Sequence, residues 1–287
     1  MHTTLICAQD LARALQGPHR ERILVLDCGF ELTDPQAGRR HYDAGHLPGA
    51  FHVHLEDTLS GPKTGRNGRH PLPDRAALAR ALAALGVNPD TQVVAYDNAG
   101  GMYAARLWWL LRWIGHEAVA VLDGGASAWQ AAGLPLTTDA PVPRAAGALV
   151  ARDGRQPTLD YAGLRAALAG HDRLVLDARA PDRYRGENET LDAVGGHIPG
   201  ARNRFFRDNL GADGRFLPPA ALREAFLARL EGRAPDAVVC QCGSGVTACH
   251  NLLAMEVAGL PGAALYPGSW SEWSAQPGAP IATGANP

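Results

Sequence analysis

The most restrictive feature of this 287-residue sequence is that it repeats itself at an almost constant shift. The run Leu-Val-Leu-Asp at 24–27 recurs unchanged at 174–177, and Gly-His-Leu-Pro-Gly-Ala at 45–50 recurs at 196–201 with Ile in place of Leu. Two weaker matches follow in the same order, pairing 93–97 with 238–242 and 122–129 with 266–273. Four collinear matches predict a tandem duplication, so the chain should fold as two copies of one domain.

Each copy alternates short apolar runs with helical patterns, which is typical of an α/β domain with a mainly parallel sheet flanked by helices. The expected strands are 23–26, 92–96, 118–122, 174–176 and 237–241, and the expected helices are 74–85, 102–113, 159–169 and 219–230. The stretch 134–156 is rich in Pro, Ala, Gly and Thr and has no periodicity, which indicates a surface linker. We expect an N-terminal domain over 1–140, a linker over 141–149 and a C-terminal domain over 150–287.

Composition excludes several classes of protein. Hydrophobic residues make up 46% and charged residues 20%, which is a globular rather than a disordered composition. The 27 Lys and Arg nearly balance the 29 Asp and Glu, so we expect no nucleic-acid partner. No apolar stretch approaches the roughly 20 residues of a membrane span, and no targeting segment is recognisable, so we expect no membrane partner and a cytoplasmic location. The odd count of five cysteines indicates free thiols rather than a disulfide framework.

One cysteine occupies a position suited to chemistry. The apolar run 238–241 ends at Cys242, a Gly243-Ser244-Gly245 turn follows, and a helical pattern begins near Thr247. In open α/β sheets, ligands bind at the carboxyl ends of strands, where such turns lie. Glycines let successive N–H groups point into the loop, and a helix N-terminus adds positive potential. A thiolate or a terminal persulfide sulfur would be stabilised there, so Cys242 is the predicted nucleophile.

Two other interpretations of this segment are disfavoured by spacing. A metal site from Cys240, Cys242, Cys249 and His250 would lack a Cys-x₂-Cys knuckle, and a helix would point Cys249 away from Cys242. Cysteine-dependent phosphatases need an arginine six residues after the nucleophile, and that position is Ala248. We therefore expect neither a metal ion nor a cofactor, and we expect the other cysteines to be structural: Cys7, Cys28, Cys240 and Cys249.

The loop 242–247, Cys-Gly-Ser-Gly-Val-Thr, resembles the six-residue active-site loop of rhodanese-family sulfurtransferases, in particular the mercaptopyruvate sulfurtransferase branch. The thiosulfate branch typically has Arg and Lys where this sequence has Gly243 and Ser244. The similarity extends over nearly the whole chain and includes the paired Gly-His-[Leu/Ile]-Pro-Gly-Ala motifs. It implies two tandem rhodanese-like domains, of which only the second is catalytic, and Asp97 stands where the first copy would carry the nucleophile.

The donor's anionic end needs a cationic site, and three arginines follow the expected strand 174–176. Guanidinium groups match carboxylate geometry, and the resemblance implies that Arg183 binds substrate with Arg179 in support. The loop residues Gly243, Gly245, Val246 and Thr247 are expected to surround the donor. Mercaptopyruvate enzymes usually carry a second arginine shortly downstream, but the stretch 189–195 has none. The candidates for a substitute are Arg185, Arg202 and Arg204.

The resemblance also implies a proton relay. Ser244 could stabilise the enolate that sulfur leaves behind, and in related enzymes the equivalent serine is linked to a histidine from the N-terminal half. We predict His46 as that histidine, while His197 in the second motif is expected to be structural.

Together these features predict a sulfurtransferase that moves sulfane sulfur from a small anionic donor, 3-mercaptopyruvate being favoured, through a Cys242 persulfide to a cyanide or thiol acceptor. The thiol could be a small molecule or a thioredoxin-like protein. Two alternatives remain open, namely a thiosulfate:cyanide sulfurtransferase and a protein that carries a persulfide or senses redox state without turnover.

Overall fold

A computed structural model describes residues 1–286. The chain divides into two compact units, which we call unit 1 and unit 2. Unit 1 comprises Met1–Gly61, Pro73–Arg155 and Gly211–Phe216. Unit 2 comprises Pro62–Leu72, Gln156–Leu210 and the described residues from Leu217 onward. Each unit thus includes one short segment from the other half of the sequence, Gly211–Phe216 in unit 1 and Pro62–Leu72 in unit 2. The predicted domain ranges do not include this exchange.

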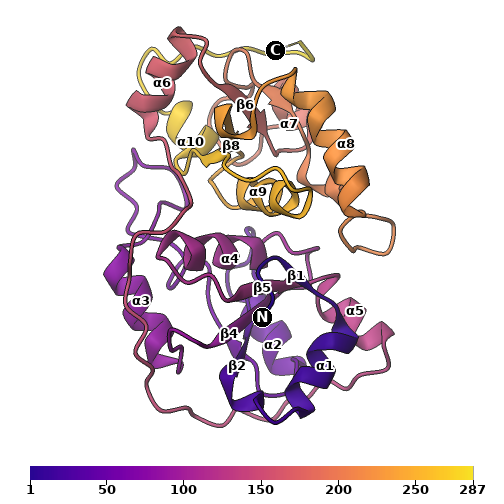
Figure 1. Cartoon of the computed structure of the whole chain (residues 1–287). Helices are drawn as coiled ribbons and strands as arrows, with labels where there is room; N and C mark the ends of the chain where they lie inside the picture. Colours follow the sequence, from indigo (N-terminus) through magenta and orange to yellow (C-terminus); the bar gives the residue numbers. More distant parts are fainter. Residues whose placement is uncertain (287) are drawn as a thin grey trace. The chain divides into compact units, whose positions relative to one another are not determined.

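Unit 1 is built on a five-stranded parallel sheet in the order β1-β5-β4-β2-β3 (Figure 1). Its strands are β1 (Leu5–Ile6), β2 (Ile23–Asp27), β3 (Phe51–His52), β4 (Gln92–Tyr96) and β5 (Val119–Leu122). Its helices are α1 (Ala8–Gln16), α2 (Ala37–Ala44), α3 (Arg75–Ala84), α4 (Ala104–Trp113) and α5 (Gly125–Ala131). Strands β2, β4 and β5 read as continuous apolar runs because helices cover both faces of a parallel sheet.

Unit 2 repeats this plan with a four-stranded parallel sheet in the order β7-β6-β8-β9. Its strands are β6 (Leu174–Asp177), β7 (Arg202–Asn203), β8 (Val238–Gln241) and β9 (Ala264–Leu265). Its helices are α6 (Tyr161–Ala169), α7 (Pro181–Arg185), α8 (Pro219–Leu230), α9 (Thr247–Val257) and α10 (Ser269–Trp273). Asp160 caps α6 by accepting a hydrogen bond from the Gly163 N–H at 2.7 Å, which satisfies a donor of the first turn.

The strand registers confirm the duplication and the predicted α/β class. Leu24 pairs with Val93 in unit 1, and their repeat equivalents Leu174 and Val238 pair in unit 2. The strand order β3-β2-β4-β5 of unit 1 matches β7-β6-β8-β9 of unit 2. Position 97 therefore follows β4 as position 242 follows β8.

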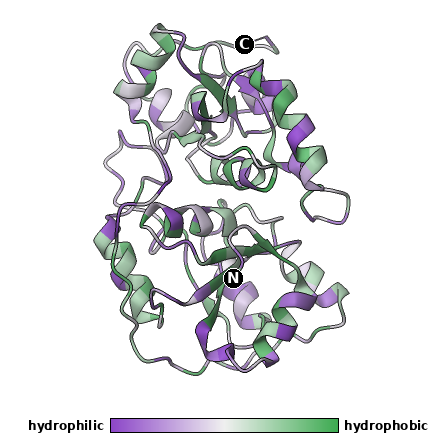
Figure 2. Cartoon of the chain, viewed as in Figure 1, coloured by the Kyte–Doolittle hydropathy of each residue, from purple (hydrophilic) through white to green (hydrophobic). Residues whose placement is uncertain are grey.

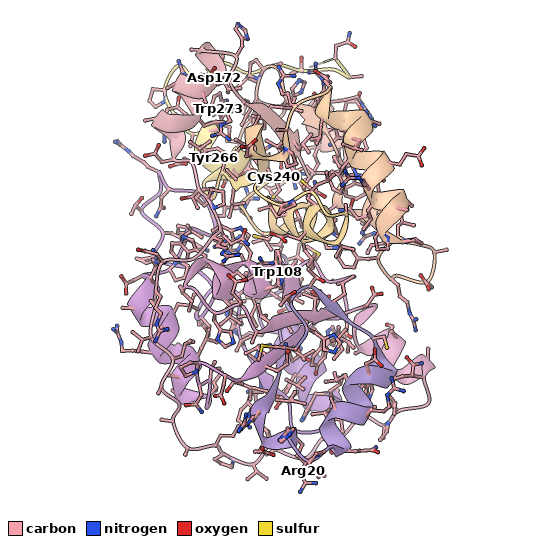
Figure 3. All side chains as sticks on the ribbon, viewed as in Figure 1. Arg20, Trp108, Asp172, Cys240, Tyr266 and Trp273 are labelled. Atoms are coloured by element: carbon pink, nitrogen blue, oxygen red, sulfur yellow. The ribbon has the colours of Figure 1, made fainter. Side chains whose placement is uncertain are left out.

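Each unit has its own apolar core. In unit 1, side chains of α1 and α5 such as Leu11 and Trp129 pack on β2, β4 and β5. In unit 2, Trp270 and Trp273 pack on the sheet with Tyr266. Figure 2 shows the strands of both sheets as hydrophobic and α8 as a helix of mixed character. Trp108 of unit 1 and Cys240 of unit 2, both labelled in Figure 3, are fully buried.

The two exchanged segments are repeat equivalents of each other. Gly68-Arg69-His70 lies between β3 and α3, and the corresponding Gly214-Arg215-Phe216 lies between β7 and α8. In unit 2 the Arg69 N–H donates to Ser271 Oγ at 3.0 Å, and in unit 1 the Phe216 N–H donates to Asp123 Oδ1 at 2.8 Å. Sequence distance thus does not decide which unit a segment joins.

The predicted linker is extended and binds to unit 1 through its backbone. The N–H groups of Gly147 and Leu149 donate to the carbonyls of Ala83 and Val87, at 2.8 and 3.1 Å. No helix among the described residues is long and apolar enough to cross a membrane.

Candidate active site

Cys242 follows β8 at the carboxyl edge of the unit 2 sheet, and it is 2% exposed. Its Sγ accepts hydrogen bonds from the N–H groups of Gly245 at 3.1 Å and Ser244 at 3.5 Å. Gly245 allows this curl because its φ of 79° lies in the left-handed region, where side chains are disfavoured. Helix α9 begins at Thr247, so its N-terminus adds positive potential beside the sulfur. The loop can therefore hold a negatively charged sulfur.

Hydrogen bonds from helix α10 hold the backbone of this loop. Ser269 Oγ accepts from the Cys242 N–H at 3.1 Å, and the N–H groups of Trp270 and Ser271 donate to the carbonyls of Cys242 and Gly243 at 2.9 and 3.0 Å. Ser269 is fully buried and has a φ of 54°, a strained value for a residue other than glycine. The strained residue is therefore one that fixes the backbone around Cys242.

The equivalent loop of unit 1 is an internal comparison for this geometry. Asp97 is 1% exposed, and its carboxylate accepts hydrogen bonds at 2.8–2.9 Å from four backbone N–H groups, those of Ala99, Gly101, Tyr103 and Ala104. The loop after β4 and the equivalent loop after β8 are thus both suited to hold an anion. In unit 1 the Asp97 side chain fills the loop, whereas in unit 2 the Cys242 sulfur occupies the equivalent place.

Ser244 faces a histidine that we did not predict. Its Oγ lies 2.8 Å from Nδ1 of His70, and the two residues are 5% and 2% exposed. His70 belongs to Pro62–Leu72, the segment that packs with unit 2. A hydroxyl and an imidazole at this distance can pass a proton between them.

The prediction that His46 partners Ser244 is wrong. The His46 ring uses Nδ1 on the Tyr42 carbonyl at 2.8 Å and Nε2 on the Asp139 carbonyl at 3.1 Å, and it stacks on the Tyr42 ring. His197 does the same in unit 2, with Nδ1 2.9 Å from the Tyr184 carbonyl and its ring stacked on Tyr184. Both histidines lock the turn of their repeated motif, which explains why the motif occurs in the copy that lacks a nucleophile.

Arg183 and Arg179 differ in what they offer to a substrate. Glu189 holds Arg183 by accepting hydrogen bonds from Nε at 3.1 Å and from Nη2 at 2.8 and 2.9 Å. The Arg183 side chain is 19% exposed. Arg179 is 1% exposed at its side chain, and each guanidinium nitrogen contacts Asp177, Glu189 or the Gly196 carbonyl. Arg179 is therefore a support that has no open edge for an anion, while Arg183 keeps Nη1 available.

The three candidate substitutes for a second arginine are engaged elsewhere. Arg185 pairs with Glu187 and Arg202 with Glu231. Arg204 donates to Asn209 Oδ1 at 2.9 Å, and burial lowers the pKa of its guanidinium. Instead Arg69, next to His70, reaches the Cys242 loop: a Cβ added to Gly243 would lie 2.9 Å from Arg69 Nη2. The signal that could have found His70 is the repeat itself, because Phe216 stands at the equivalent position of the second copy. Arg69 gives no such signal, since its equivalent is also an arginine, Arg215.

Burial and charge set the ionisation of the groups around the loop. Burial alone would raise the pKa of Glu189, but hydrogen bonds from Arg183 and from backbone N–H groups outweigh it and lower the pKa. Burial raises the pKa of the Cys240 and Cys28 thiols, so these two remain neutral and inert. No group of three His, Cys, Asp or Glu side chains suited to a metal ion occurs in residues 1–286.

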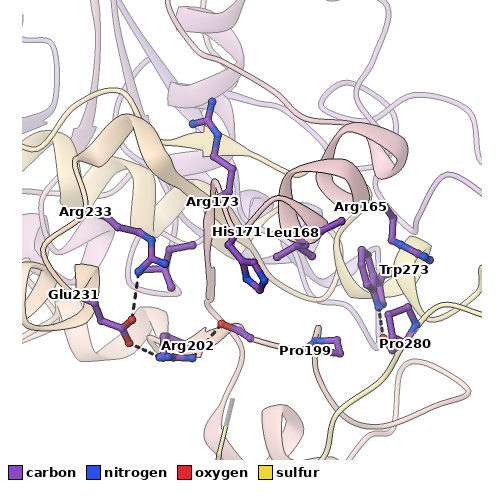
Figure 4. Close-up of a pocket in the computed structure, with 13 residues that line it drawn as sticks. Arg165, Leu168, His171, Arg173, Pro199, Arg202, Glu231, Arg233, Trp273 and Pro280 are labelled. Atoms are coloured by element: carbon purple, nitrogen blue, oxygen red, sulfur yellow. Dashed lines mark hydrogen bonds and ion pairs between the residues drawn. The ribbon is translucent and has the colours of Figure 1, made fainter.

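A cavity of about 560 Å³ in unit 2 is separate from this site. It lies beside Leu174 at the start of β6, whereas Cys242 follows the end of β8. Figure 4 shows Glu231 between Arg202 and Arg233 at this cavity, and the Trp273 indole N–H on the Pro280 carbonyl. Of the residues considered for the site, only Arg202, a candidate for the second arginine, lines it.

Known proteins resemble this chain over nearly its whole length. The rhodanese-like domain family matches residues 7–132 and again 161–276. A probable 3-mercaptopyruvate sulfurtransferase from Pseudomonas aeruginosa is 51% identical over 282 residues and covers 98% of each chain. A putative thiosulfate sulfurtransferase from Mycobacterium tuberculosis is 40% identical and covers 98% of this chain and 97% of that protein.

The solved structures agree with these relatives. The crystal structure of SseA from Escherichia coli, described as a 3-mercaptopyruvate sulfotransferase, has a TM-score of 0.78 and 31% identity. The match covers 94% of this chain and 99% of that one. The predicted tandem architecture and sulfurtransferase activity are confirmed, and the chain belongs to the rhodanese family.

Proposed function

We propose that the protein transfers the sulfane sulfur of 3-mercaptopyruvate to a cyanide or thiol acceptor through a persulfide on Cys242. The observation that carries this proposal is the combination of two N–H donors on Cys242 Sγ with the Ser244–His70 contact in the same loop. The first favours a charged sulfur, and the second supplies a proton where a carbanion forms. The relative with 51% identity, described as a probable 3-mercaptopyruvate sulfurtransferase, supports this donor.

In the first half-reaction the Cys242 thiolate attacks the donor sulfur. The new S–S bond takes the place of the donor's C–S bond, whose electron pair leaves on carbon as the enolate of pyruvate. The proton of the donor thiol reaches that carbon through His70 and the Ser244 hydroxyl. The cysteine sulfur is oxidised and the carbon is reduced, so thiolate and mercaptopyruvate become persulfide anion and pyruvate without an external oxidant.

In the second half-reaction an acceptor attacks the outer sulfur. Cyanide leaves as thiocyanate and a thiol leaves as its persulfide, and both regenerate the Cys242 thiolate. Gly243, Gly245, Val246 and Thr247 surround the transferred sulfur, and Arg183 holds the donor's carboxylate. A reducing compartment keeps the thiolate available, so we place the enzyme in the cytoplasm, with a small thiol or a thioredoxin-like protein as acceptor.

The test is the intact mass of the protein after mixing with 3-mercaptopyruvate. A persulfide adds one sulfur atom, about 32 Da, and cyanide should remove it. Cys242→Ser should show no adduct. Cys7→Ser, which makes the same atomic change at a helix N-cap of unit 1, should retain it. An adduct that persists in Cys242→Ser would contradict the assignment of the nucleophile.

Thiosulfate is the second candidate donor, because a relative with 40% identity is described as a putative thiosulfate sulfurtransferase. Thiocyanate formation from each donor, with cyanide as acceptor, separates the two: a higher kcat/KM for thiosulfate would overturn the choice of mercaptopyruvate. Discharge of the persulfide to a protein acceptor alone, with no turnover on cyanide or small thiols, would instead indicate a carrier.

A further inference from the structure

Two arginine side chains approach Gly243 closely. A Cβ at this position would lie 2.9 Å from Arg69 Nη2 and 3.4 and 3.5 Å from Arg183 Nη2 and Nη1. Both guanidinium groups thus meet at one point, one residue after Cys242. A side chain at position 243 would have to displace them.

Two buried carboxylates hold these arginines by their other nitrogens. Asp192 forms an ion pair with Arg69 Nη1, and Glu189 accepts from Nε and Nη2 of Arg183. The carboxylate side chains are 7% and 4% exposed. Within residues 1–286, Arg69 Nη2 and Arg183 Nη1 make no hydrogen bond to protein. Arg69 Nη2 and Arg183 Nη1, which would lie 2.9 and 3.5 Å from that Cβ, are therefore held in place and open to a ligand, whereas Arg183 Nη2 is engaged by Glu189.

Ser271 ties Arg69 to the reactive loop. Its Oγ accepts from the Arg69 N–H at 3.0 Å, and its own N–H donates to the Gly243 carbonyl at 3.0 Å. One residue of α10 thus sets the position of both the arginine and the loop. Such fixed geometry is what a bidentate contact with a carboxylate requires.

The charges of this cluster balance. Arg69 and Arg183 carry two positive charges, and Asp192 and Glu189 carry two negative charges. Asp192 Oδ2 also lies 3.6 Å from Arg183 Nη2, so this carboxylate acts on both arginines. A bound anion therefore finds N–H donors but no excess positive charge. That arrangement favours one negative charge over two, because an uncompensated charge is costly in a site of low polarity.

We propose that Arg69 and Arg183 form a two-arginine clamp for the carboxylate of a monoanionic α-keto acid donor, and that Asp192 is the residue that disfavours dianionic donors such as thiosulfate. This inference rests on the proposed function and names the residues that select its substrate. The clamp takes one arginine from each repeat, which compensates for the absence of an arginine in 189–195.

The first test is the kinetics of Arg69→Gln with mercaptopyruvate and cyanide. Losing one charged hydrogen-bond donor should raise KM by roughly 10- to 100-fold with kcat changed much less, and Arg69→Lys should recover part of the loss. Product inhibition by pyruvate should weaken by a similar factor, which reports binding without chemistry. Arg66→Gln, an exposed arginine on the same segment, is the matched control and should leave both constants unchanged.

The second test is the donor preference of Asp192→Asn. Removing one negative charge acts twice as strongly on a dianion as on a monoanion, so the kcat/KM ratio of thiosulfate to mercaptopyruvate should rise about tenfold. An unchanged ratio would overturn the role of Asp192, and an unchanged KM and pyruvate inhibition in a folded Arg69→Gln would overturn the clamp. If the wild-type protein itself forms no persulfide from mercaptopyruvate, the proposed function fails instead. A thermal melt of each variant confirms that it is folded.

Discussion

Ser244 Oγ lies 2.8 Å from His70 Nδ1, although 174 residues separate the two in sequence. The pair is buried, and it adjoins the cysteine whose sulfur accepts the Ser244 N–H. The hydroxyl and the imidazole are thus placed as the proposed proton relay requires.

His70→Asn should lower kcat/KM for mercaptopyruvate by roughly 10²–10⁴-fold, because a positioned acid–base group contributes about that much. Its thermal stability should change much less. His46→Asn should instead lower thermal stability and leave kcat/KM of the folded protein unchanged. If the two variants behave alike, the relay is assigned to the wrong histidine.

Asp97→Asn should destabilise unit 1. The carboxylate accepts four backbone N–H groups, and an amide offers only one oxygen to them. Hydrogen bonds to a charged group contribute about 1.5–3 kcal/mol each, so a loss of roughly 2–4 kcal/mol is expected after partial rearrangement. Urea unfolding measures it, and Asp90→Asn at an exposed position is the control. Equal midpoints for the two variants would show that the cradle does not need an anion.

Gly245→Ala should abolish persulfide formation. The new Cβ would lie 2.5 Å from the Pro267 carbonyl in addition to the strain of a φ of 79°. Gly200→Ala shares the strain, with φ 82°, but meets nothing within 4 Å, so it isolates that contribution. We expect Gly200→Ala to cost about 1–2 kcal/mol of stability and to retain the mass adduct. Retention of the adduct in Gly245→Ala would mean that the loop tolerates a different shape.

The contribution of Glu189 to folding stability depends on pH in the acid range. Its pKa in the folded protein lies below the ordinary value of 4.5, since hydrogen bonds from Arg183 and the backbone outweigh burial. The ionised carboxylate therefore contributes stability that is fully present above pH 4.5 and is lost as the pH falls through the lowered pKa. Thermal melts from pH 7 to 3 should show a smaller acid-dependent loss in Glu189→Gln than in wild type. Parallel curves would contradict this role.

Much of the fold is predictable from the sequence alone. The longer strands were predictable because buried parallel strands are short, continuous apolar runs. The predicted ranges 23–26, 92–96 and 174–176 lie within β2, β4 and β6, and 118–122 and 237–241 begin one residue before β5 and β8. The two-residue strands β1, β3, β7 and β9 were not predictable, since a pair of residues carries no periodicity. Their place comes from pairing with a neighbouring strand.

The assignment of His46 failed for a related reason. A motif present in both repeats points first to what the repeats share, which is the stacked His–Tyr turn seen at His46 and His197. Functional differences lie where the copies diverge, as at Asp97 and Cys242 or at His70 and Phe216. Comparison of the copies at every position would have singled out His70.

The sequence by itself determined the duplication, the α/β architecture and Cys242 as the candidate nucleophile, because strands, glycine turns and helix starts are encoded by neighbouring residues. Only the tertiary structure decided that Arg69 and His70 accompany that cysteine. Their segment, Pro62–Leu72, lacks hydrophobic periodicity and joins unit 2 through contacts about 200 residues away, such as the Arg69 N–H on Ser271 Oγ. Local propensities contain no information about such contacts, since these depend on where the whole chain folds.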